Sequence, residues 1–393
     1  MSRPVVIVGG GLAGQRCAEA LRRGGFGGRV RLVCAEPAPP YDRPPLSKEL
    51  LAGERDLASL RLRPDRWYDD NDVELLTGRR ATAIDPHERN VVLQDGARLT
   101  YDRLVVATGA GARTLPELAG RDNVLTLRDA GDATVLAQRI GPGVRLLIVG
   151  GGFIGLEVAS TAAGLGAEVT VLEAAPAPLA GALGAGTGHW FAELHRRNGI
   201  DVRVGARIAG TRGRGSCDAV ELGDGGWLQT DVVLVAVGAV PDTRWLARAG
   251  LDADGVVVGP GGASAVPGIL AAGDAARPVD PFTGRPGRRE HWESAARSGT
   301  AVARLLLGHA PAPDPPAGFW SDQHGIRINL VGDPSRADRT TVDGDLDAAD
   351  FAVTYWRRDA PVAVLLAGRP DALPAARALL ADPPPTNQNR SAA

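Results

Sequence analysis

The stretch VVIVGGGLAGQRCAEALRRGG, residues 5–25, decides the fold of the first part of this chain. Its four apolar residues predict a buried strand, because three of them are β-branched valines and the fourth is isoleucine. The pattern Gly9-x-Gly11-x-x-Gly14 follows at once and predicts a tight turn into a helix. A strand, a glycine turn and a helix in this order predict an α/β fold with a parallel sheet.

Each of these three glycines has a separate structural role. The first permits the tight turn, the second lets a pyrophosphate approach the backbone, and the third lets helix and strand pack closely. The helix then points its free amide groups at the phosphates. The next strand, RVRLVCAE, ends on an acid that can accept hydrogen bonds from a ribose. These features predict a dinucleotide site formed by Gly9, Gly11, Leu12, Ala13, Gly14 and Glu36.

The same pattern returns in VRLLIVGGGFIGLEVASTAAGLGAEVTVLEAAP, residues 144–176. It again has a strand, a glycine turn, a helix and a second strand that ends on an acid. Two complete patterns predict two dinucleotides, whereas the alternative is a duplicated glycine turn that binds nothing. The predicted second site contains Gly150, Gly152, Phe153, Ile154, Gly155 and Glu173.

Glu173 predicts which nicotinamide cofactor is used. Its carboxylate can bind the ribose 2′-hydroxyl of NAD and would repel the 2′-phosphate of NADP. The residues that follow, AAPAPLA, contain no arginine that could attract that phosphate. We therefore expect NADH.

Two dinucleotide sites in one chain suggest an electron path between a tightly held flavin and an exchangeable nicotinamide. YDRLVVATGA, residues 101–110, predicts a strand that leads Thr108 and Gly109 into a turn. GILAAGDAA, residues 268–276, places Asp274 directly after another apolar strand, where it could bind the ribityl hydroxyls of FAD. A helix N-cap is the alternative role for Asp274, and both roles can hold together.

Composition narrows the class of protein further. The formal net charge of −2 gives no indication of nucleic acid or of a membrane surface. The three cysteines form no CxxC pair, which favours a reducing, cytoplasmic location. The histidines show no ligand spacing, so no metal is expected, and His195 is interpreted as a solvated or core residue. Lys48 is the only lysine beside 43 arginines, which codon bias or a specific role could explain.

The chain resembles a known family at eight motifs, which occur in the order of that family. They are VVIVGGGLAG, YDRPPLSKELL, VVATGA, LLIVGGGFIGLEVA, VLVAVGAVPDT, ILAAGDAA, EHWESA and FWSDQ. These motifs are similar to those of the two-dinucleotide-binding flavoproteins, and PPLSK and FWSDQ are typical of the ferredoxin reductases that serve oxygenases. The resemblance implies two Rossmann-like domains of the glutathione reductase type and a small α+β C-terminal domain.

The same resemblance implies domain boundaries. We expect a discontinuous FAD domain at 1–110 and 240–315, an NAD domain at 111–239 and a C-terminal domain at 316–382. The proline-rich stretch HAPAPDPPAG, residues 309–318, reads as the linker before that last domain. The polar tail at 383–393 is expected to be disordered.

The resemblance also implies roles for individual residues. The lysine of PPLSK, Lys48, would approach the flavin ring and pair with Glu157, where a compact ammonium fits better than the planar fork of arginine. Trp320 of FWSDQ would cover the flavin ring, or it packs in the core with no redox role. The catalytic residues are thus Lys48, Glu157 and Trp320. The further FAD contacts expected are Arg43, Lys48, Ala107, Thr108, Gly109, Arg128, Asp274, Glu290, His291, Trp292, Ala295 and Trp320, and the further NAD contacts are Glu157, Val237 and Gly238.

Two departures from the family pattern matter. Ser294 and Ser298 stand where the family has amides, which puts the hydrogen bonds at the pyrimidine end of the flavin in doubt. The cysteines Cys17, Cys34 and Cys217 do not occupy the redox-active position of the related disulfide reductases, so we expect them to be inert.

The sequence therefore predicts an FAD-containing oxidoreductase that passes electrons from NADH to a small acidic iron–sulfur ferredoxin, which feeds a haem monooxygenase or a ring-hydroxylating dioxygenase. The arginines at 285–289 could contribute to the docking of that ferredoxin. A rubredoxin reductase, an NADH oxidase and a redox-responsive binding protein stay open as alternatives. The sequence leaves the oligomeric state, monomer or dimer, undecided.

Overall fold

The computed structural model describes residues 4–251, 254–280, 284–312 and 315–381. The chain divides into two compact units, which are described separately. The first unit holds Met1–Arg43, Leu57–Gly111 and Ala239–Asp314, and the second holds Pro44–Asp56, Ala112–Gly238 and Pro315–Ala393. The short segment that carries Lys48 thus belongs to the second unit. The tail at 383–393, for which disorder was expected, lies outside the described residues.

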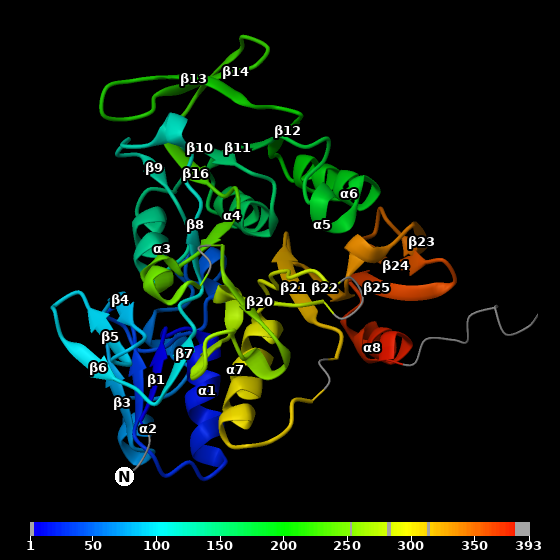
Figure 1. The fold of residues 1–393 in the computed structure, drawn as a ribbon. Helices are drawn as coiled ribbons and strands as arrows, with labels where there is room; N and C mark the ends of the chain where they lie inside the picture. The colour runs from blue at the N-terminus through cyan, green and yellow to red at the C-terminus, as the bar shows by residue number, and fades with distance from the viewer. Residues whose placement is uncertain (1–3, 252–253, 281–283, 313–314, 382–393) are drawn as a thin grey trace, which may run out of the picture. The chain divides into compact units, whose positions relative to one another are not determined.

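The first unit is built on a five-stranded parallel sheet in the order β19-β7-β1-β2-β3. Figure 1 labels its strands β1, β3 and β7. Every strand of this sheet is short and rich in valine or leucine, as expected for strands buried on both faces. The strands are β1 (Val5–Val8), β2 (Val30–Val33), β3 (Val73–Leu76), β7 (Arg103–Val106) and β19 (Ile269–Ala271).

Both faces of this sheet are covered. On one face, α1 (Leu12–Arg23) and α7 (Trp292–Leu306) pack on Ile7, Leu32 and their neighbours. The two helices approach closely at Gly299, where an added Cβ would lie 2.1 Å from the carbonyl oxygen of Ala13. The opposite face packs on Ile84, Val91 and Trp245. The remaining elements of the unit are α2 (Arg66–Asp70), β4 (Ala81–Asp85), β5 (Asn90–Leu93), β6 (Arg98–Thr100), β8 (Ala110–Ala112), β17 (Ala239–Pro241), β18 (Val256–Val258) and β20 (Ala276–Pro278).

The second unit contains its own five-stranded parallel sheet, in the order β12-β11-β10-β16-β9. A small antiparallel sheet of β13, β14 and β15 packs against it through Val220 and Cys217. The elements are β9 (Val124–Leu125), α3 (Ala130–Ala137), β10 (Arg145–Val149), α4 (Phe153–Gly164), β11 (Glu168–Glu173), α5 (Ala180–Leu183), α6 (Ala185–Arg197), β12 (Asp201–Val204), β13 (Ile208–Arg212), β14 (Ala219–Leu222), β15 (Trp227–Gln229) and β16 (Val232–Val235).

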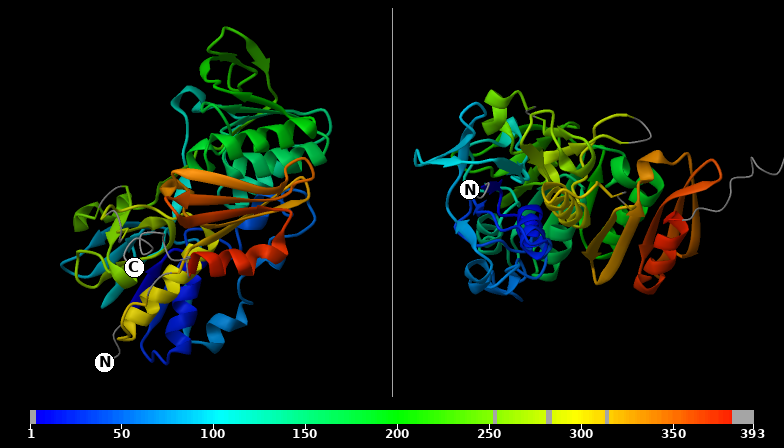
Figure 2. Two further views of the ribbon diagram at one scale, coloured as in Figure 1. Left: turned by 90° about the vertical axis from the view of Figure 1, so that its right-hand side faces the viewer. Right: turned by 60° about the horizontal axis from the view of Figure 1, so that its bottom comes forward.

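The C-terminal part of the second unit is an antiparallel sheet in the order β21-β22-β25-β24-β23. Helix α8 (Leu373–Ala381) lies along one face of it (Figure 2). The strands are β21 (Gly318–Gln323), β22 (Ile326–Gly332), β23 (Arg339–Asp345), β24 (Asp350–Arg357) and β25 (Ala360–Ala367). The predicted fold class, two dinucleotide-binding α/β parts and a small α+β C-terminal part, is confirmed.

Candidate functional site

The first glycine turn joins β1 to α1 and combines tight packing with an open approach. An added Cβ at Gly9 would lie 2.0 Å from the carbonyl oxygen of Ala107, and one at Gly14 would lie 2.1 Å from that of Gly9. At Gly11, by contrast, an added Cβ would meet no atom within 4 Å. No side chain caps the start of α1, so its amide groups face this open space. The turn therefore fits a bound pyrophosphate.

The second turn joins β10 to α4 and repeats this geometry. An added Cβ at Gly150 would lie 2.5 Å from the carbonyl oxygen of Ala236, and one at Gly155 would lie 2.2 Å from the carbonyl oxygen of Gly150. At Gly152 the nearest atom would be 3.9 Å away. The start of α4 also has no side-chain cap. The predicted residues Leu12 and Ala13, and Phe153 and Ile154, form the first turns of the two helices.

The two acids predicted at the ends of the second strands are both held in place. Glu36 lies three residues beyond β2, which ends at Val33, whereas Glu173 is the last residue of β11. Glu36 accepts hydrogen bonds from the Tyr41 hydroxyl and from Nη2 of Arg43, each at 2.5 Å. Arg43, predicted as a flavin contact, is thus seen bound to Glu36. Glu173 ends β11 and accepts from the backbone amides of Gly151 at 2.8 Å and Ala175 at 2.7 Å. These bonds fix a negative charge beside the second turn.

The C-terminal ends of β1, β7 and β19 meet at one edge of the parallel sheet, because these strands are neighbours. Thr108, which follows β7, donates from Oγ1 to the carbonyl oxygen of Asp242 at 2.6 Å, and Gly109 has a φ of 71°. Asp274 follows β19 in a single 3₁₀ turn, Gly273–Ala275, whose N-cap is Ala272. The alternative role of Asp274 as an N-cap is therefore wrong, and its position at the edge is as expected.

The start of α7 brings further residues to the first unit's site. Nε1 of Trp292 donates to the Asp42 carboxylate at 2.6 Å. Ser298 accepts from the backbone amide of Gly273 at 2.9 Å, so it supports the turn that carries Asp274. Oγ of Ser294 is buried and has no hydrogen-bond partner among the described residues. A buried hydroxyl left over at this helix fits a ligand that would accept or donate there. Glu290 and His291 precede this helix and Ala295 lies in it.

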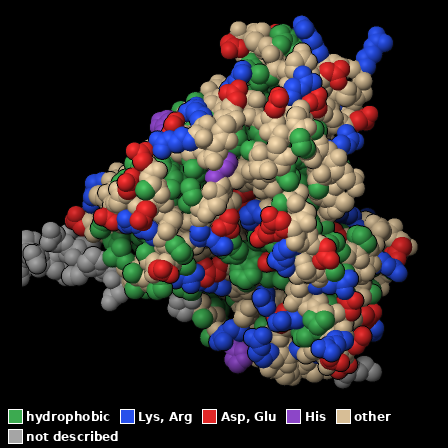
Figure 3. Space-filling model, turned by 180° about the vertical axis from the view of Figure 1, so that it is seen from behind, with side chains coloured by type: hydrophobic (Ala, Val, Ile, Leu, Met, Phe, Trp, Pro, Cys, Tyr) green, Lys and Arg blue, Asp and Glu red, His purple; other side chains and the backbone are tan. Residues whose placement is uncertain are grey.

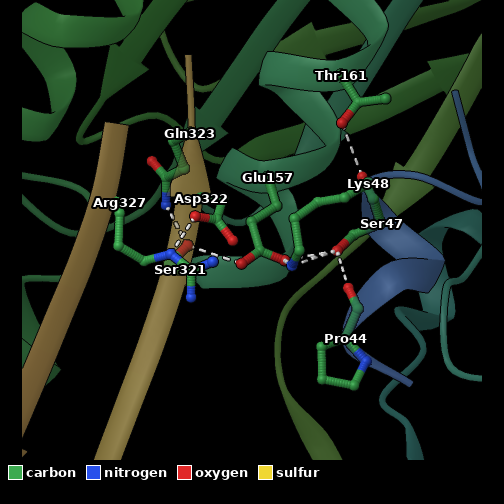
Figure 4. Close-up of polar contacts among 9 residues, drawn as sticks. All are labelled: Pro44, Ser47, Lys48, Glu157, Thr161, Ser321, Asp322, Gln323 and Arg327. Atoms are coloured by element: carbon green, nitrogen blue, oxygen red, sulfur yellow. Dashed lines mark hydrogen bonds and ion pairs between the residues drawn. The ribbon is translucent and has the colours of Figure 1, made fainter. Parts of the chain in front are cut away.

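Lys48 and Glu157 form an ion pair inside the second unit, with 2.7 Å between Nζ and Oε2 (Figure 4). The predicted pairing is therefore confirmed, and both side chains are largely buried, at 13% and 8% exposure. Ser47 donates to the same carboxylate oxygen at 2.5 Å, and Ser321 of β21 donates to Oε1 at 2.7 Å. Thr161 of α4 holds the carbonyl oxygen of Ser47 at 2.8 Å.

The remaining predicted residues take these positions. Arg128 precedes α3, and its backbone amide donates to Asp132 at 2.8 Å. Val237 and Gly238 follow β16, where Gly238 has a φ of 101°. Trp320 lies half-buried in β21. Arg128, Trp320 and Lys48 belong to the second unit, whereas the other predicted FAD contacts belong to the first.

All three cysteines are free and buried. Burial raises the pKa of the Cys17 thiol to about 12, and burial, followed by the charge of Glu36, raises that of Cys34 to about 12. Burial also raises the pKa of Cys217. None of these thiols is a thiolate near neutral pH, as expected for inert cysteines.

Among the described residues, no group of three or more His, Cys, Asp or Glu side chains is placed so that it could hold a metal ion. In that part of the chain, no helix is both long and apolar enough to cross a membrane. His195 is fully buried and hydrogen-bonded, so it is a core histidine and not a solvated one.

Two open glycine turns, each with a fixed acid, define a protein that holds two dinucleotides. Residues 3–299 match the family described as pyridine nucleotide-disulphide oxidoreductase, and residues 318–392 match the reductase C-terminal family. The chain therefore belongs to the pyridine nucleotide-disulphide oxidoreductase family, and it is an oxidoreductase whose cofactors are FAD and NADH.

Named relatives resemble the chain over nearly its whole length. Putidaredoxin reductase of Pseudomonas putida is 36% identical, over 98% of this chain and 93% of the relative. The ferredoxin–NAD(+) reductase subunit of a benzene 1,2-dioxygenase system from Pseudomonas putida is 40% identical, over 85% and 81%. A solved covalent putidaredoxin reductase–putidaredoxin complex has a TM-score of 0.93 at 35% identity, covering 96% of this chain and 93% of the other. The family expected from the sequence motifs is confirmed.

Several site residues gave no signal in the sequence. Asp42, Ser47, Ser321 and Gln323 are small or neutral polar residues inside motifs whose lysine, tryptophan or prolines drew attention instead. Only their contacts identify them, and most of those contacts join segments more than a hundred residues apart.

Proposed function

We propose that this protein is an NADH-dependent ferredoxin reductase. It takes a hydride from NADH onto FAD and passes single electrons to a small iron–sulfur ferredoxin, which feeds a haem monooxygenase or a ring-hydroxylating dioxygenase. Per turnover, one NADH and two oxidised ferredoxins give NAD⁺, two reduced ferredoxins and one proton. Relatives that match nearly the whole chain are named as reductases of this kind, which supports the proposal.

The observation that carries this function is the pairing of two dinucleotide turns with three inert thiols. Relatives that act on disulfides need a reactive thiol beside the flavin, and a buried thiol with a pKa of about 12 cannot serve. Electrons that enter from NADH must therefore pass from the flavin to the acceptor without a thiol of this chain as a relay. A one-electron protein carrier is the acceptor that the named relatives support.

The residues divide this work between the two turns. In the first unit, Gly9, Gly11 and Gly14 would hold the FAD pyrophosphate, and Asp274 would bind its ribityl hydroxyls. In the second unit, Gly150, Gly152 and Gly155 would hold the NADH pyrophosphate, and Glu173 would select NADH over NADPH. Bound FAD supplies a ring that accepts two electrons together and releases them one at a time.

Lys48 is proposed as the cation that stabilises the negative charge arriving with the hydride. Its burial and its ion pair with Glu157 support this role, since a buried charge is retained at a cost in free energy. Substitution of Lys48 by methionine keeps the length and the apolar stem but removes the charge. We expect K48M to bind FAD and to be reduced by NADH more slowly than the wild type.

The ferredoxin is proposed to be acidic and to dock at the arginines of 285–289. Arg285 is exposed, and Arg288 forms an ion pair with Glu290 at 3.0 Å. Complementary charge of this kind accelerates the encounter of two proteins.

The test is NADH-driven reduction of cytochrome c by the purified FAD-loaded protein, with and without an iron–sulfur ferredoxin. We expect strong stimulation by ferredoxin and a preference for NADH over NADPH. NADH consumption that is indifferent to added ferredoxin would contradict the proposal, since it would identify oxygen or another carrier as the acceptor.

A further inference from the structure

A chain of hydrogen-bonded side chains leads away from the Lys48–Glu157 pair through the second unit, and Figure 4 shows its first links, Ser321 and Gln323. Ser321 donates to Oε1 of Glu157 at 2.7 Å, and Nε2 of Gln323 donates to Oγ of Ser321 at 2.9 Å. Oε1 of Gln323 lies 3.0 Å from Nε2 of His195, whose Nδ1 lies 3.1 Å from Nε2 of His324. The side chains of Glu157, Ser321, Gln323 and His195 are all buried. The function proposed above uses only Glu157 among these four.

The carboxylate sets the direction of every hydrogen bond in this chain. A serine hydroxyl has one proton, and a carboxylate can only accept, so the Ser321 proton goes to Glu157. Ser321 must then accept from the Gln323 amide nitrogen, which leaves the Gln323 oxygen facing His195. An amide oxygen can only accept, so Nε2 of His195 carries the proton.

The two histidines continue the same direction. Burial lowers the pKa of His195 to about 4, so its ring is neutral near neutral pH and its Nδ1 has no proton. That nitrogen accepts from Nε2 of His324, whose pKa burial also lowers. All four bonds thus donate toward Glu157, and bonds aligned in this way strengthen one another.

The turn between β21 and β22 explains why these side chains keep their places. Gln323 and Ile326 pair across a two-residue turn, His324-Gly325, in which both residues have positive φ, 50° and 76°. The backbone amide of His324 also donates to Oγ of Ser160 on α4, at 2.7 Å. The turn is therefore tied to the same helix that carries Glu157.

We infer that His195 is a positioning residue, which acts through Gln323 and Ser321 to hold the Glu157 carboxylate in the orientation that binds Lys48. The terminal torsion of a glutamate is broad, so hydrogen bonds and not rotamer preference decide where its two oxygens point. Oε2 takes Lys48 and Ser47, and Oε1 takes Ser321. Removal of the Oε1 partner frees the carboxylate to rotate away from Lys48. The effect on NADH turnover rests on the role proposed above for Lys48.

The first experiment needs no turnover. Nitrogen-15 histidine labelling of the FAD-loaded protein, with the proton–nitrogen couplings measured by NMR, reports which ring nitrogen carries the proton. We expect His195 to be neutral at neutral pH with its proton on Nε2, and H195Q assigns its signals by removing them. A neutral ring with its proton on Nδ1 in place of Nε2 would reverse the chain of donors and overturn the inference.

The second experiment compares variants by two readouts, the rate of flavin reduction by NADH and the flavin midpoint potential. H195L removes the donor to Gln323, and S321A removes the contact with Glu157 at almost no cost in volume. We expect both to slow reduction roughly five- to ten-fold and to shift the potential in the same direction as K48M, by a smaller amount. H195Q can place an amide near Nε2 and should restore the wild-type values to within about two-fold.

Y355F is the matched control. The Tyr355 hydroxyl is buried, donates to the carbonyl oxygen of Leu183 and lies 3.0 Å from Oγ1 of Thr187 on α6, the helix that carries His195, but it does not join the chain to Glu157. We expect its rate and potential to match the wild type. Equal loss in Y355F would show that the effect comes from weakened packing and would overturn the positioning role.

The outcomes separate this inference from the proposed function. If K48M shifts the flavin midpoint potential and neither S321A nor H195L does, the row of hydrogen bonds from His195 to Glu157 is structural only. The inference is then wrong, while the reductase function stands. If K48M leaves the potential unchanged, the role of Lys48 and the positioning role fail together. If ferredoxin does not stimulate the wild type, the proposed acceptor is wrong, while the tautomer and the potentials still decide the inference.

Discussion

Lys48 shows why an ammonium is kept in a chain that otherwise uses arginine for its cations. The Glu157 carboxylate already receives Ser47 on one oxygen and Ser321 on the other. A guanidinium prefers two parallel bonds to both oxygens of a carboxylate, and here Ser321 already donates to the second oxygen. A single-point donor on a flexible stem satisfies the site, which favours a specific role over codon bias for this lysine.

Coenzyme preference is expected to depend on the Glu173 carboxylate. In the double variant E173A with A174R, the acid that repels a 2′-phosphate is replaced by an adjacent base that attracts it. We expect kcat/KM for NADPH to rise and that for NADH to fall, so that their ratio changes by roughly a hundred-fold. Steady-state kinetics with both coenzymes measure this ratio, and G226A on a remote hairpin is the control. An unchanged ratio would remove Glu173 from the specificity site.

The acid stability of the protein should carry the signature of His195. The pKa of this ring is lowered from 6.5 to about 4 by burial first, and by the nearby His324 as a smaller cause. Below pH 6.5 this histidine binds a proton in the unfolded chain but stays neutral in the folded protein. The free energy of unfolding therefore falls as the pH drops from 6.5 toward 4, by at most about 3 kcal/mol from this residue.

H195Q has no group that titrates in this range at that position. We expect thermal midpoints of the wild type to fall more steeply on acidification than those of H195Q. Parallel curves for the two proteins would contradict the lowered pKa. H189Q, which alters an exposed histidine on the same helix, should behave like the wild type.

At the scale of elements, the sequence predicted the two glycine turns but not the row of hydrogen bonds that leads from His195 to Glu157. The strand, turn and helix of each dinucleotide pattern follow from local rules, and the structure has them at the expected residues. Ser321 and Glu157, in contrast, are 164 residues apart, and no periodicity links them. The role of Asp274 as an N-cap was wrong because a 3₁₀ turn and not a helix follows β19. The specific contacts of Trp320 and Arg128 with FAD stay predictions.

Alanine substitutions at Gly14 and Gly11 of the first turn should have different effects, one on stability and the other on FAD binding. An added Cβ at Gly14 meets the carbonyl oxygen of Gly9 at 2.1 Å, so G14A forces α1 away from β1 and lowers stability by about 2 kcal/mol or more. An added Cβ at Gly11 meets no atom within 4 Å, so G11A should fold normally and retain little FAD.

FAD content per protein and thermal unfolding of the apoprotein separate the two effects. G152A is the matched variant in the second turn, and we expect it to keep FAD and weaken NADH binding. If G11A unfolds like G14A, or keeps its full FAD, the open space at Gly11 is not where the pyrophosphate approaches.

At the scale of the whole molecule, charge is balanced and spread. Basic and acidic side chains are interspersed over the face drawn in Figure 3, and the net charge is −2. Attraction of the acidic ferredoxin proposed above would therefore depend on a local group of arginines, whose charge salt screens over about 10 Å at 0.1 M. The arginines at 285–289 are visible as a cluster in the sequence, but their role as the docking group stays a prediction.

We expect the ferredoxin-dependent rate to fall roughly ten-fold between about 0.02 M and 0.5 M salt, whereas direct reduction of ferricyanide changes little. R285E should lower the ferredoxin-dependent rate at low salt and flatten this dependence. R214E, which makes the same change of charge in the other arginine-rich stretch, is the control. Equal loss in both variants would show that net charge alone matters and that 285–289 is not the docking group.

The burial of the three thiols has a consequence for oxidative damage. An enzyme that works beside an oxygenase is exposed to hydrogen peroxide whenever the oxygenase reduces oxygen without using its substrate. Peroxide attacks cysteine thiolates and methionine thioethers first. Here each thiol is buried with a raised pKa, and the chain contains one methionine, at its first residue. Almost no sulfur atom in this protein is therefore open to oxidation by peroxide. The reductase should keep its activity in the presence of the peroxide that its own electrons help to produce.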